Sequence, residues 1–155
     1  MLRIIRAESK KQIEQAKILF SEYASSLGFD LSFQDFQDEL KNIPGEYSPP
    51  SGCLLLAVED EEVTGCVALR DLGDDVCEMK RLYVRPRFRG KRVGRALAMA
   101  IIEKAGKIGY DKMRLDTVPS MKEAIGLYRA LGFKEITLYR YNPLHGALFM
   151  ELRLD

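Results

Sequence analysis

Short apolar runs separated by turn residues dominate the pattern of hydrophobic and polar positions along this chain. Runs of this kind, bounded by glycine, proline, asparagine or acidic residues, are typical of β-strands. The strands predicted in this way cover residues 2–6, 53–59, 63–69, 76–84, 113–118, 133–141 and 147–154.

Apolar residues at helical spacing predict helices between some of these strands. The first helix follows a capping box of Ser9 and Gln12 and stops at Gly28. Another helix covers residues 94–108 and stops at Gly109. The apolar residues on the inner faces of these two helices are Ile13, Ala16, Phe20, Tyr23, Leu27, Val93, Leu97, Ala100, Ile101 and Ala105.

Two further helices are expected from caps and spacing. Ser32 and Asp35 are candidate caps of a short helix, and Ser120 begins a longer one that Gly132 ends. Their inward apolar residues are Phe33, Phe36, Leu40, Ala124, Ile125, Tyr128 and Leu131. Residues 42–52 contain three prolines and two glycines, so we expect a loop before the second strand.

The lengths of the connections predict how the strands pair. Residues 53–84 form three strands with short turns, which is the pattern of an antiparallel meander. The strand 76–84, the helix 94–108 and the strand 113–118 form one strand–helix–strand unit, whose crossover is right-handed and whose strands are parallel. We therefore expect one layered domain over residues 1–155, of mixed α/β (α+β) class.

Composition agrees with a single globular domain and excludes several classes of protein. The chain has 155 residues, 46% hydrophobic and 30% charged, which excludes a disordered or collagen-like chain. Its three cysteines form no CxxC pair and it has one histidine, so we expect no disulfide framework, no zinc site and a reduced, cytoplasmic setting. No signal peptide or apolar run of about 18 residues occurs, so no membrane association is expected.

Charge is distributed unevenly although the net charge is only +1. Residues 1–78 carry 7 Lys/Arg and 16 Asp/Glu, whereas residues 79–155 carry 17 and 7. The positive charge is concentrated in residues 85–95, Arg-Pro-Arg-Phe-Arg-Gly-Lys-Arg-Val-Gly-Arg, which lack any acidic residue. This asymmetry predicts that the second half of the chain receives an anion.

The cationic segment lies between a predicted strand and the start of a predicted helix. Cations at a helix N-terminus oppose the helix dipole unless an anion binds there, and free backbone N–H groups at that place bind phosphate well. Gly90 and Gly94 let the backbone approach such a ligand closely. A solvated basic turn is the plainer alternative. The P-loop and dinucleotide-binding patterns are both absent, and a compact cluster of positive charge favours a small ligand over nucleic acid.

Two segments resemble signatures of the GNAT superfamily of N-acyltransferases. Arg89-Gly90-Lys91-Arg92-Val93-Gly94 is similar to the family's acyl-CoA pyrophosphate loop, (Gln/Arg)-x-x-Gly-x-(Gly/Ala). Residues 124–133, Ala-Ile-Gly-Leu-Tyr-Arg-Ala-Leu-Gly-Phe, resemble the second signature, Ala-x-x-Leu-Tyr-x-x-x-Gly-Phe. The order of elements over residues 1–154 also matches. The resemblance implies a GNAT-like fold, with a central mixed sheet of about seven strands and helices on both faces.

The resemblance also implies acetyl-CoA as the acyl donor and places it. Its diphosphate would lie on the N–H groups of residues 89–94, and its pantetheine arm would pair with the backbone of residues 82–84, between splayed strands. The residues expected to bind the cofactor are Leu82, Tyr83, Val84, Arg89, Gly90, Lys91, Arg92, Val93, Gly94, Arg95 and Tyr128. Two positions depart from the family. Arg92 replaces the middle glycine of the loop, and Met121 stands where the family often has an asparagine.

Acyl transfer from a thioester to an amine requires a proton acceptor for the amine and a donor for the departing thiolate. By resemblance, Tyr128 would protonate the thiolate; a core aromatic residue is the alternative. By resemblance to the histone acetyltransferase branch, Glu78 would take the proton of the amine. The alternatives are that Glu78 forms an ion pair with Lys80 or a cross-strand cation, and that a chain of water molecules takes the proton. Simple strand alternation puts Glu78, Lys80, Leu82 and Val84 on one face.

Other residues that could bear chemistry have plainer explanations. Cys77 is expected to be a small buried side chain, and His145 a histidine of a surface turn. Asp116 could meet either an amine substrate or an arginine of its own fold. The acceptor would lie near the loops 27–33, 42–52 and 139–145, which the family varies.

The function predicted from the sequence is direct transfer of acetyl from acetyl-CoA to a primary amine of a small molecule or a peptide, with no metal, nucleic acid or membrane involved. A homodimer is compatible with this prediction. One alternative is a non-catalytic acyl-CoA-binding module, which would bind acetyl-CoA without turnover. Another is a nucleic-acid-binding domain, whose binding would weaken steeply with salt.

Overall fold

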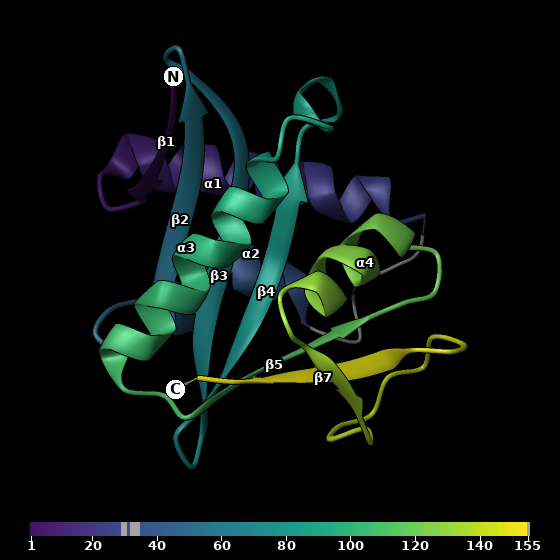
Figure 1. Ribbon diagram of the computed structural model, residues 1–155. Helices are drawn as coiled ribbons and strands as arrows, with labels where there is room; N and C mark the ends of the chain where they lie inside the picture. Colours follow the sequence, from purple (N-terminus) through teal and green to yellow (C-terminus); the bar gives the residue numbers. More distant parts are fainter. Residues whose placement is uncertain (29–30, 32–34, 155) are drawn as a thin grey trace.

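The computed structural model describes residues 1–28, 31 and 35–154. Within this part of the chain, seven strands form one sheet in the order β1-β2-β3-β4-β5-β7-β6 (Figure 1). The strands are β1 (Leu2–Arg6), β2 (Cys53–Glu59), β3 (Glu62–Gly73), β4 (Val76–Val84), β5 (Lys112–Thr117), β6 (Lys134–Ile136) and β7 (Leu148–Arg153). The antiparallel pairing of β2, β3 and β4 and the parallel pairing of β4 with β5 are as predicted. The pairs β1–β2, β5–β7 and β6–β7 are antiparallel as well.

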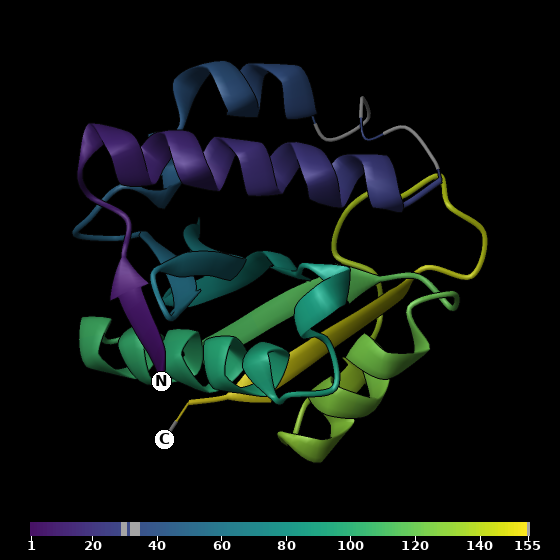
Figure 2. The same cartoon turned by 90° about the horizontal axis from the view of Figure 1, so that it is seen from above.

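Helices cover both faces of the sheet (Figure 2). They are α1 (Lys10–Ser26), α2 (Phe36–Asn42), α3 (Val93–Ile108) and α4 (Lys122–Ala130). α1 and α2 lie on one face, and α3 and α4 lie on the other. The mixed α/β class is therefore confirmed. None of these helices in the described ranges has the length and apolar character needed to cross a bilayer.

The local signals at the helix ends hold in most cases. Ser9 and Gln12 form the predicted capping box, and Gly109 ends α3 in the left-handed conformation at φ +112°. Asp35 is the N-cap of α2 but makes no side-chain capping bond, and the other cap candidate, Ser32, lies outside the described residues, as does Phe33. α4 begins two residues after Ser120, with Met121 at its N-cap.

Two apolar layers sandwich the sheet. Leu97 and Ile101 of α3 pack on Met113 in one layer, and Leu19 and Phe20 of α1 pack on the opposite face in the other. The three cysteines are free and buried in these layers. Burial raises the pKa of each thiol, that of Cys77 to about 12.

β4 contains a bulge that overturns the predicted face pattern. Arg81 has φ +59°, and the register with β3 shifts so that Arg81 and Leu82 together oppose Val67. The extra residue switches the alternation. Leu82 and Val84 therefore pack on the α3 side, whereas Glu78 and Lys80 lie on the face covered by α1 and α2. The prediction that these four residues share one face is wrong.

Two strands also differ in length from expectation. β3 is longer, because residues after Leu69 continue to pair with β4, Arg70 opposite Glu78. The strand predicted over 133–141 shrinks to β6, Lys134–Ile136. The chain leaves the sheet after β6, and Tyr139 and Arg140 instead bond to Glu78 through their side chains.

Candidate active site

The cationic segment forms a short 3-10 turn, Pro86–Phe88, and a loop that runs into α3. Gly90 and Arg92 both have positive φ, +80° and +65°. The first backbone bond of α3 runs from the N–H of Ala96 to the carbonyl of Arg92, so the N–H groups of the preceding residues point out of the helix start. Arg92 thus adopts the left-handed turn that a glycine would adopt more easily.

A groove of about 830 Å³ lies beside this loop and runs along the end of β4 toward α4. The residues expected to bind the cofactor that line it are Leu82, Tyr83, Val84, Arg89, Gly90, Arg92, Val93 and Gly94. Lys91 and Arg95 are exposed and do not line it. The structure therefore gathers most of the predicted cofactor residues around one space.

The loop is tied to β4 by a side chain. The Nε of Arg89 donates to the carbonyl of Val84 at 2.9 Å, and its guanidinium lies 5.8 Å from the centre of the Tyr83 ring. Arg89 therefore connects the end of β4 to the turn before α3, and both border the groove.

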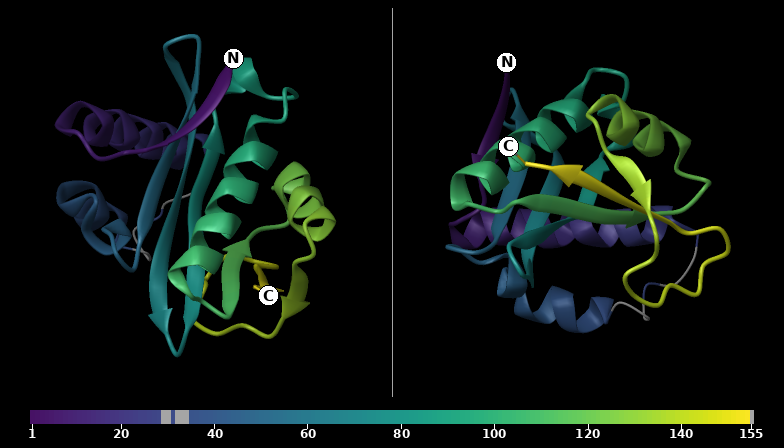
Figure 3. Two further views of the ribbon diagram at one scale, coloured as in Figure 1. Left: turned by 60° about the vertical axis from the view of Figure 1, so that its left-hand side comes forward. Right: turned by 60° about the horizontal axis from the view of Figure 1, so that its bottom comes forward.

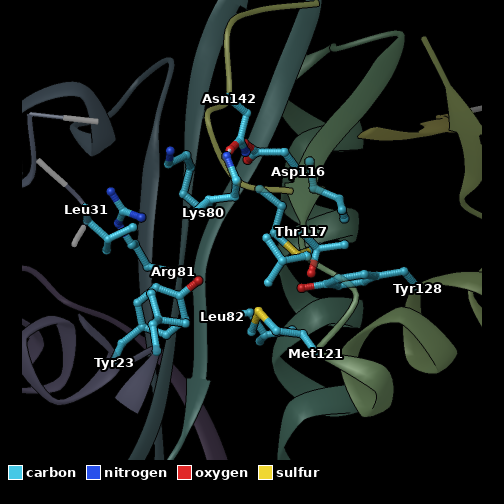
Figure 4. Close-up of a pocket in the computed structure, with 15 residues that line it drawn as sticks. Tyr23, Leu31, Lys80, Arg81, Leu82, Asp116, Thr117, Met121, Tyr128 and Asn142 are labelled. Atoms are coloured by element: carbon cyan, nitrogen blue, oxygen red, sulfur yellow. The ribbon is translucent and has the colours of Figure 1, made fainter. Parts of the chain in front are cut away.

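β4 and β5 separate at the place where the groove reaches them. Their pairing ends at Glu78 opposite Arg114, and β5 and β7 then run in a different direction from β2–β4 (Figures 1 and 3). A passage of about 50 Å³ occupies the opening (Figure 4). It shares Tyr23, Leu27, Leu82 and Met121 with the groove, so it continues the groove into the sheet.

Tyr128 of α4 presents its hydroxyl to this passage (Figure 4). Its ring packs against Phe133 at 5.7 Å between centroids, and burial raises the pKa of the phenol. The hydroxyl of Thr117, on β5, lines the same passage, and it is buried without a hydrogen-bond partner among the described residues. Two hydroxyls therefore border a space in which β4 and β5 make no ladder.

Glu78 lies at the centre of a buried ionic cluster. Its Oε1 lies 2.8 Å from the Nε of Arg70 and 3.9 Å from the Nζ of Lys80. Its Oε2 lies 2.6 Å from an Nη of Arg140 and accepts a 2.6 Å hydrogen bond from the Tyr139 hydroxyl. The carboxylate is fully buried and lines none of the three cavities described here: groove, passage and second pocket.

The electrostatics of the cluster keep Glu78 ionised. Burial alone would raise its pKa, but Lys80, Arg140, Arg70 and the hydrogen bond from Tyr139 outweigh burial and lower it. For Lys80, burial and the nearby Arg81 lower the pKa to about 8, against the opposing pull of Glu78. From the sequence, Glu78 could act either as a base or as a partner in an ion pair, and in the structure it forms ion pairs.

A second pocket, of about 470 Å³, lies on the α2 side of the sheet. Its walls come from α2, the 3-10 turn Gly45–Tyr47, Arg70 of β3, Lys80 of β4 and the segment 140–141. Lys80 lines both this pocket and the passage. The groove, the passage and the pocket therefore follow one another across the sheet.

The remaining candidates take structural positions. Cys77 is buried on the α3 side, and His145 is exposed in a turn. Asp116 pairs with Arg140 at 2.9 Å and accepts a hydrogen bond from Asn142, so it meets an arginine of its own fold. Over the described ranges, no cluster of three or more His, Cys, Asp or Glu side chains could hold a metal ion.

Sequence reasoning missed several residues of the site. Thr117 lies on a predicted strand whose alternation predicts its face, so that signal was available. Arg70 lies one residue beyond the predicted strand 63–69, and β3 continues through it. Arg140 carries no such signal, because it reaches Glu78 from irregular chain 62 residues away. Of the predicted acceptor loops, 42–52 and 139–145 border the second pocket, and 27–33 lies largely outside the described residues.

Comparisons with known proteins identify the family. Residues 14–133 match the Acetyltransferase (GNAT) family. An uncharacterized N-acetyltransferase of Schizosaccharomyces pombe is 42% identical over 94% of this chain and 90% of its own. A GNAT acetyltransferase of Staphylococcus aureus superposes with a TM-score of 0.82 over the whole of both chains, at 21% identity. An acetyltransferase of Salmonella typhimurium, solved with its cofactor acetyl-CoA, covers 99% of this chain and 94% of its own, with TM-score 0.72 and 20% identity. The chain therefore belongs to the GNAT acetyltransferase family.

Proposed function

We propose that this acetyltransferase binds acetyl-CoA in the groove beside α3 and passes its acetyl group directly to a primary amine in the second pocket. The observation that carries the proposal is that three cavities follow one another across the sheet. The groove begins at the cationic loop, narrows to the passage beside Tyr128 and continues into a pocket large enough for a small molecule.

The loop residues would hold the diphosphate. The N–H groups at the start of α3 and the positive helix end favour a phosphate there, and the guanidinium of Arg92 adds charge. The pantetheine arm would lie along Leu82–Val84 and pair with backbone groups of β4. The thioester would then reach the passage where β4 and β5 separate.

The chemistry is a displacement at the thioester carbonyl. The amine nitrogen attacks the carbonyl carbon, the C–S bond breaks, and the thiolate takes a proton from the Tyr128 hydroxyl. The raised pKa of Tyr128 keeps that proton on the phenol at neutral pH. The products are an N-acetyl amine and CoA.

The proton of the amine has two routes, Glu78 or water. Glu78 has ion pairs on both carboxylate oxygens and does not line the passage, which favours water leading out through the second pocket. In this proposal Glu78 holds Arg70, Lys80 and Arg140 in place. Binding of acetyl-CoA without transfer is the rival function.

An acceptor screen with acetyl-CoA, detecting the free CoA thiol, tests the transfer. Gly94→Glu tests the placement, because it puts a carboxylate beside the expected diphosphate while leaving the helix dipole satisfied. We expect acetyl-CoA affinity, measured by calorimetry, to fall about tenfold or more. Gly106→Glu, on an exposed turn of the same helix with open space around it, is the matched control and should bind normally.

Two results would contradict the proposal. Normal acetyl-CoA affinity in a folded Gly94→Glu protein would remove the diphosphate from this loop. Tight binding of acetyl-CoA with no thiol release for any amine would favour the binding-only module.

A further inference from the structure

The second pocket has a floor built around two arginines. Arg70 of β3 and Arg140, from the segment after β6, both line it, and both hold Glu78 from opposite sides of its carboxylate. Their side chains are about three-quarters buried, 22% and 26% exposed. Charges in such positions are screened less by salt and water than surface charges.

Neither guanidinium has its donors fully used by the described residues. Arg140 contributes one terminal nitrogen, Nη2, to both Glu78 and Asp116, and its Nε and other Nη have no hydrogen-bond partner in the described ranges. Arg70 uses Nε for Glu78 and Nη1 for Glu46. A guanidinium offers five N–H donors in a planar fork that fits a carboxylate, so donors remain on both.

Glu46 supplies direct information on what this site accepts. Its carboxylate reaches in from the turn Gly45–Tyr47 and lies 2.6 Å from the Nη1 of Arg70, yet the side chain is 68% exposed. The exposed partner of this ion pair gains little from it, so another carboxylate can take its place on Arg70. The pocket thus contains a carboxylate that a ligand carboxylate could displace at little cost.

The rim of the pocket is acidic, which bears on the choice of ligand. Asp35 and Asp38 line the outer wall, but both are exposed to solvent. Glu39 lies deeper and is already bonded to Arg81 at 2.6 Å. Water screens the rim charges, whereas the arginine floor is shielded, so the floor decides which group binds inside.

The geometry also limits the distance between the bound anion and the reacting amine. Lys80 marks the junction of the pocket with the passage, and it lies 3.9 Å from the same Glu78 carboxylate that Arg140 contacts at 2.6 Å. A carboxylate held by the arginines would therefore lie near the mouth of the passage, where the amine would react. A free amino acid, which joins its amine to its carboxylate by a short link, fits this arrangement better than a protein lysine.

We propose that Arg70 and Arg140 bind the carboxylate of the acceptor, and that the acceptor is a small amino acid whose carboxylate displaces Glu46. This inference rests on the proposed acetyl transfer and names its substrate class. Glu46 then competes with the substrate for Arg70 and occupies the site when it is empty.

The first experiment compares acceptors that differ in one group. Free amino acids, their amides, the amines left after decarboxylation and O-phosphoethanolamine are each supplied with acetyl-CoA, and thiol release is confirmed by the mass of the product. We expect an amino acid to exceed its own amide and decarboxylated amine in kcat/KM by about tenfold or more. Activity confined to amines without a carboxylate, or to the phosphate ester, would overturn the assignment.

The second experiment uses the two partners of one ion pair. Arg70→Gln should raise KM for the amino acid about ten- to hundredfold and leave KM for acetyl-CoA unchanged. Glu46→Gln should lower KM for the amino acid, because the competing carboxylate is gone. If the ion pair were purely structural, both variants would shift KM for the amino acid in the same direction, and that result would overturn the proposal. The control is Arg6→Gln, which removes an arginine of β1 that pairs with Glu8. It should change neither the KM for the amino acid nor the KM for acetyl-CoA.

Failure of the proposed function stays distinguishable from failure of this site. If no amine is acetylated although acetyl-CoA binds, the proposed function falls, and thermal shifts of the CoA-loaded protein with glycine and L-aspartate test the pocket alone. Stabilisation that Arg70→Gln removes and Glu46→Gln increases would support the carboxylate site. Absence of any stabilisation would overturn it.

Discussion

Tyr128 has an apolar ring contact and a hydroxyl in the passage, so the two parts of the side chain can be tested separately. Tyr128→Phe keeps the packing against Phe133 and removes only the proposed proton donor. We expect the single-turnover rate to fall by about 10²–10⁴ with acetyl-CoA affinity nearly unchanged. Rapid-quench measurement of CoA release provides the rate.

Tyr110 offers a matched control for this substitution. It is also buried, but its hydroxyl donates to the carbonyl of Ser51, away from the passage. Tyr110→Phe should reduce stability by about 1 kcal/mol and leave the rate alone. Equal single-turnover rates for wild type and Tyr128→Phe would make Tyr128 a packing residue.

Glu78 connects the ionic cluster to a dependence of stability on pH. Its folded pKa is lowered, so it contributes stability that is present above its ordinary value of 4.5 and is lost as the pH falls toward the folded pKa. Glu78→Gln should lower the free energy of unfolding by about 3–5 kcal/mol at neutral pH, because three cations lose a buried partner. The difference in stability from wild type should shrink as the pH falls below 4.5. Denaturant unfolding between pH 7 and pH 3 measures it.

The same variant decides whether Glu78 takes the amine proton. If water carries the proton, the acidic limb of kcat/KM against pH keeps its position in Glu78→Gln. If the acidic limb of the profile shifts in Glu78→Gln and the lost activity is recovered in basic buffer, Glu78 is the base.

At the scale of single residues, sequence reasoning predicted positions better than partners. Gly90, Gly94 and Tyr128 occupy the places that their motifs imply, because short motifs encode local backbone shape. Lys80, one of the predicted partners of Glu78, does lie 3.9 Å from its carboxylate. Tyr139 and Arg140 could not be predicted as partners, since they lie more than 60 residues away and come from irregular chain. Only the folded sheet brings them together.

Among the elements, the loop before α3 depends on a left-handed residue that is not glycine. Arg92 has φ +65°, which glycine adopts freely and β-branched residues adopt at a cost of about 1–2 kcal/mol or more. Arg92→Gly and Arg92→Val both remove the charge, so their difference isolates backbone shape. We expect the Gly variant to bind acetyl-CoA more tightly than the Val variant by about tenfold, measured by calorimetry. Equal affinities would mean that the loop shape does not matter for binding.

The elements that sequence patterns missed share one physical origin. Periodicity assumes a regular strand, and one inserted residue at Arg81 reverses it in β4. β6 is short, and Tyr139 and Arg140 beyond it bond through their side chains to Glu78 of β4 instead of continuing the ladder with β7. The limits of β2 and β4 and the capped start of α1 were predictable because their signals are local.

In the whole molecule the sheet opens between β4 and β5, and the proposed pantetheine arm would fill the opening. Acetyl-CoA should slow amide hydrogen exchange in residues 82–84, if the pantetheine arm pairs with that backbone. Adenosine 3′,5′-diphosphate, which lacks the arm, should leave exchange there unchanged. Exchange followed by mass spectrometry tests this, and equal protection by both ligands would place the arm elsewhere.

At this scale the antiparallel order of β2, β3 and β4 and the parallel pairing of β4 with β5 followed from connection lengths, whereas the insertion of β7 between β5 and β6 did not. The course of the cavities did not, because it depends on how far β5 and β7 turn away from β4 and on side chains that meet across the opening. Sequence therefore predicted the loop before α3 more fully than the second pocket.

The burial of all three cysteines has a practical consequence for measuring this enzyme. Colorimetric disulfide reagents react with accessible thiolates, and these thiols are shielded and hold their protons. The folded protein thus contributes little background colour, and the signal in such an assay comes from the CoA that turnover releases. A rising blank would, in turn, report unfolding.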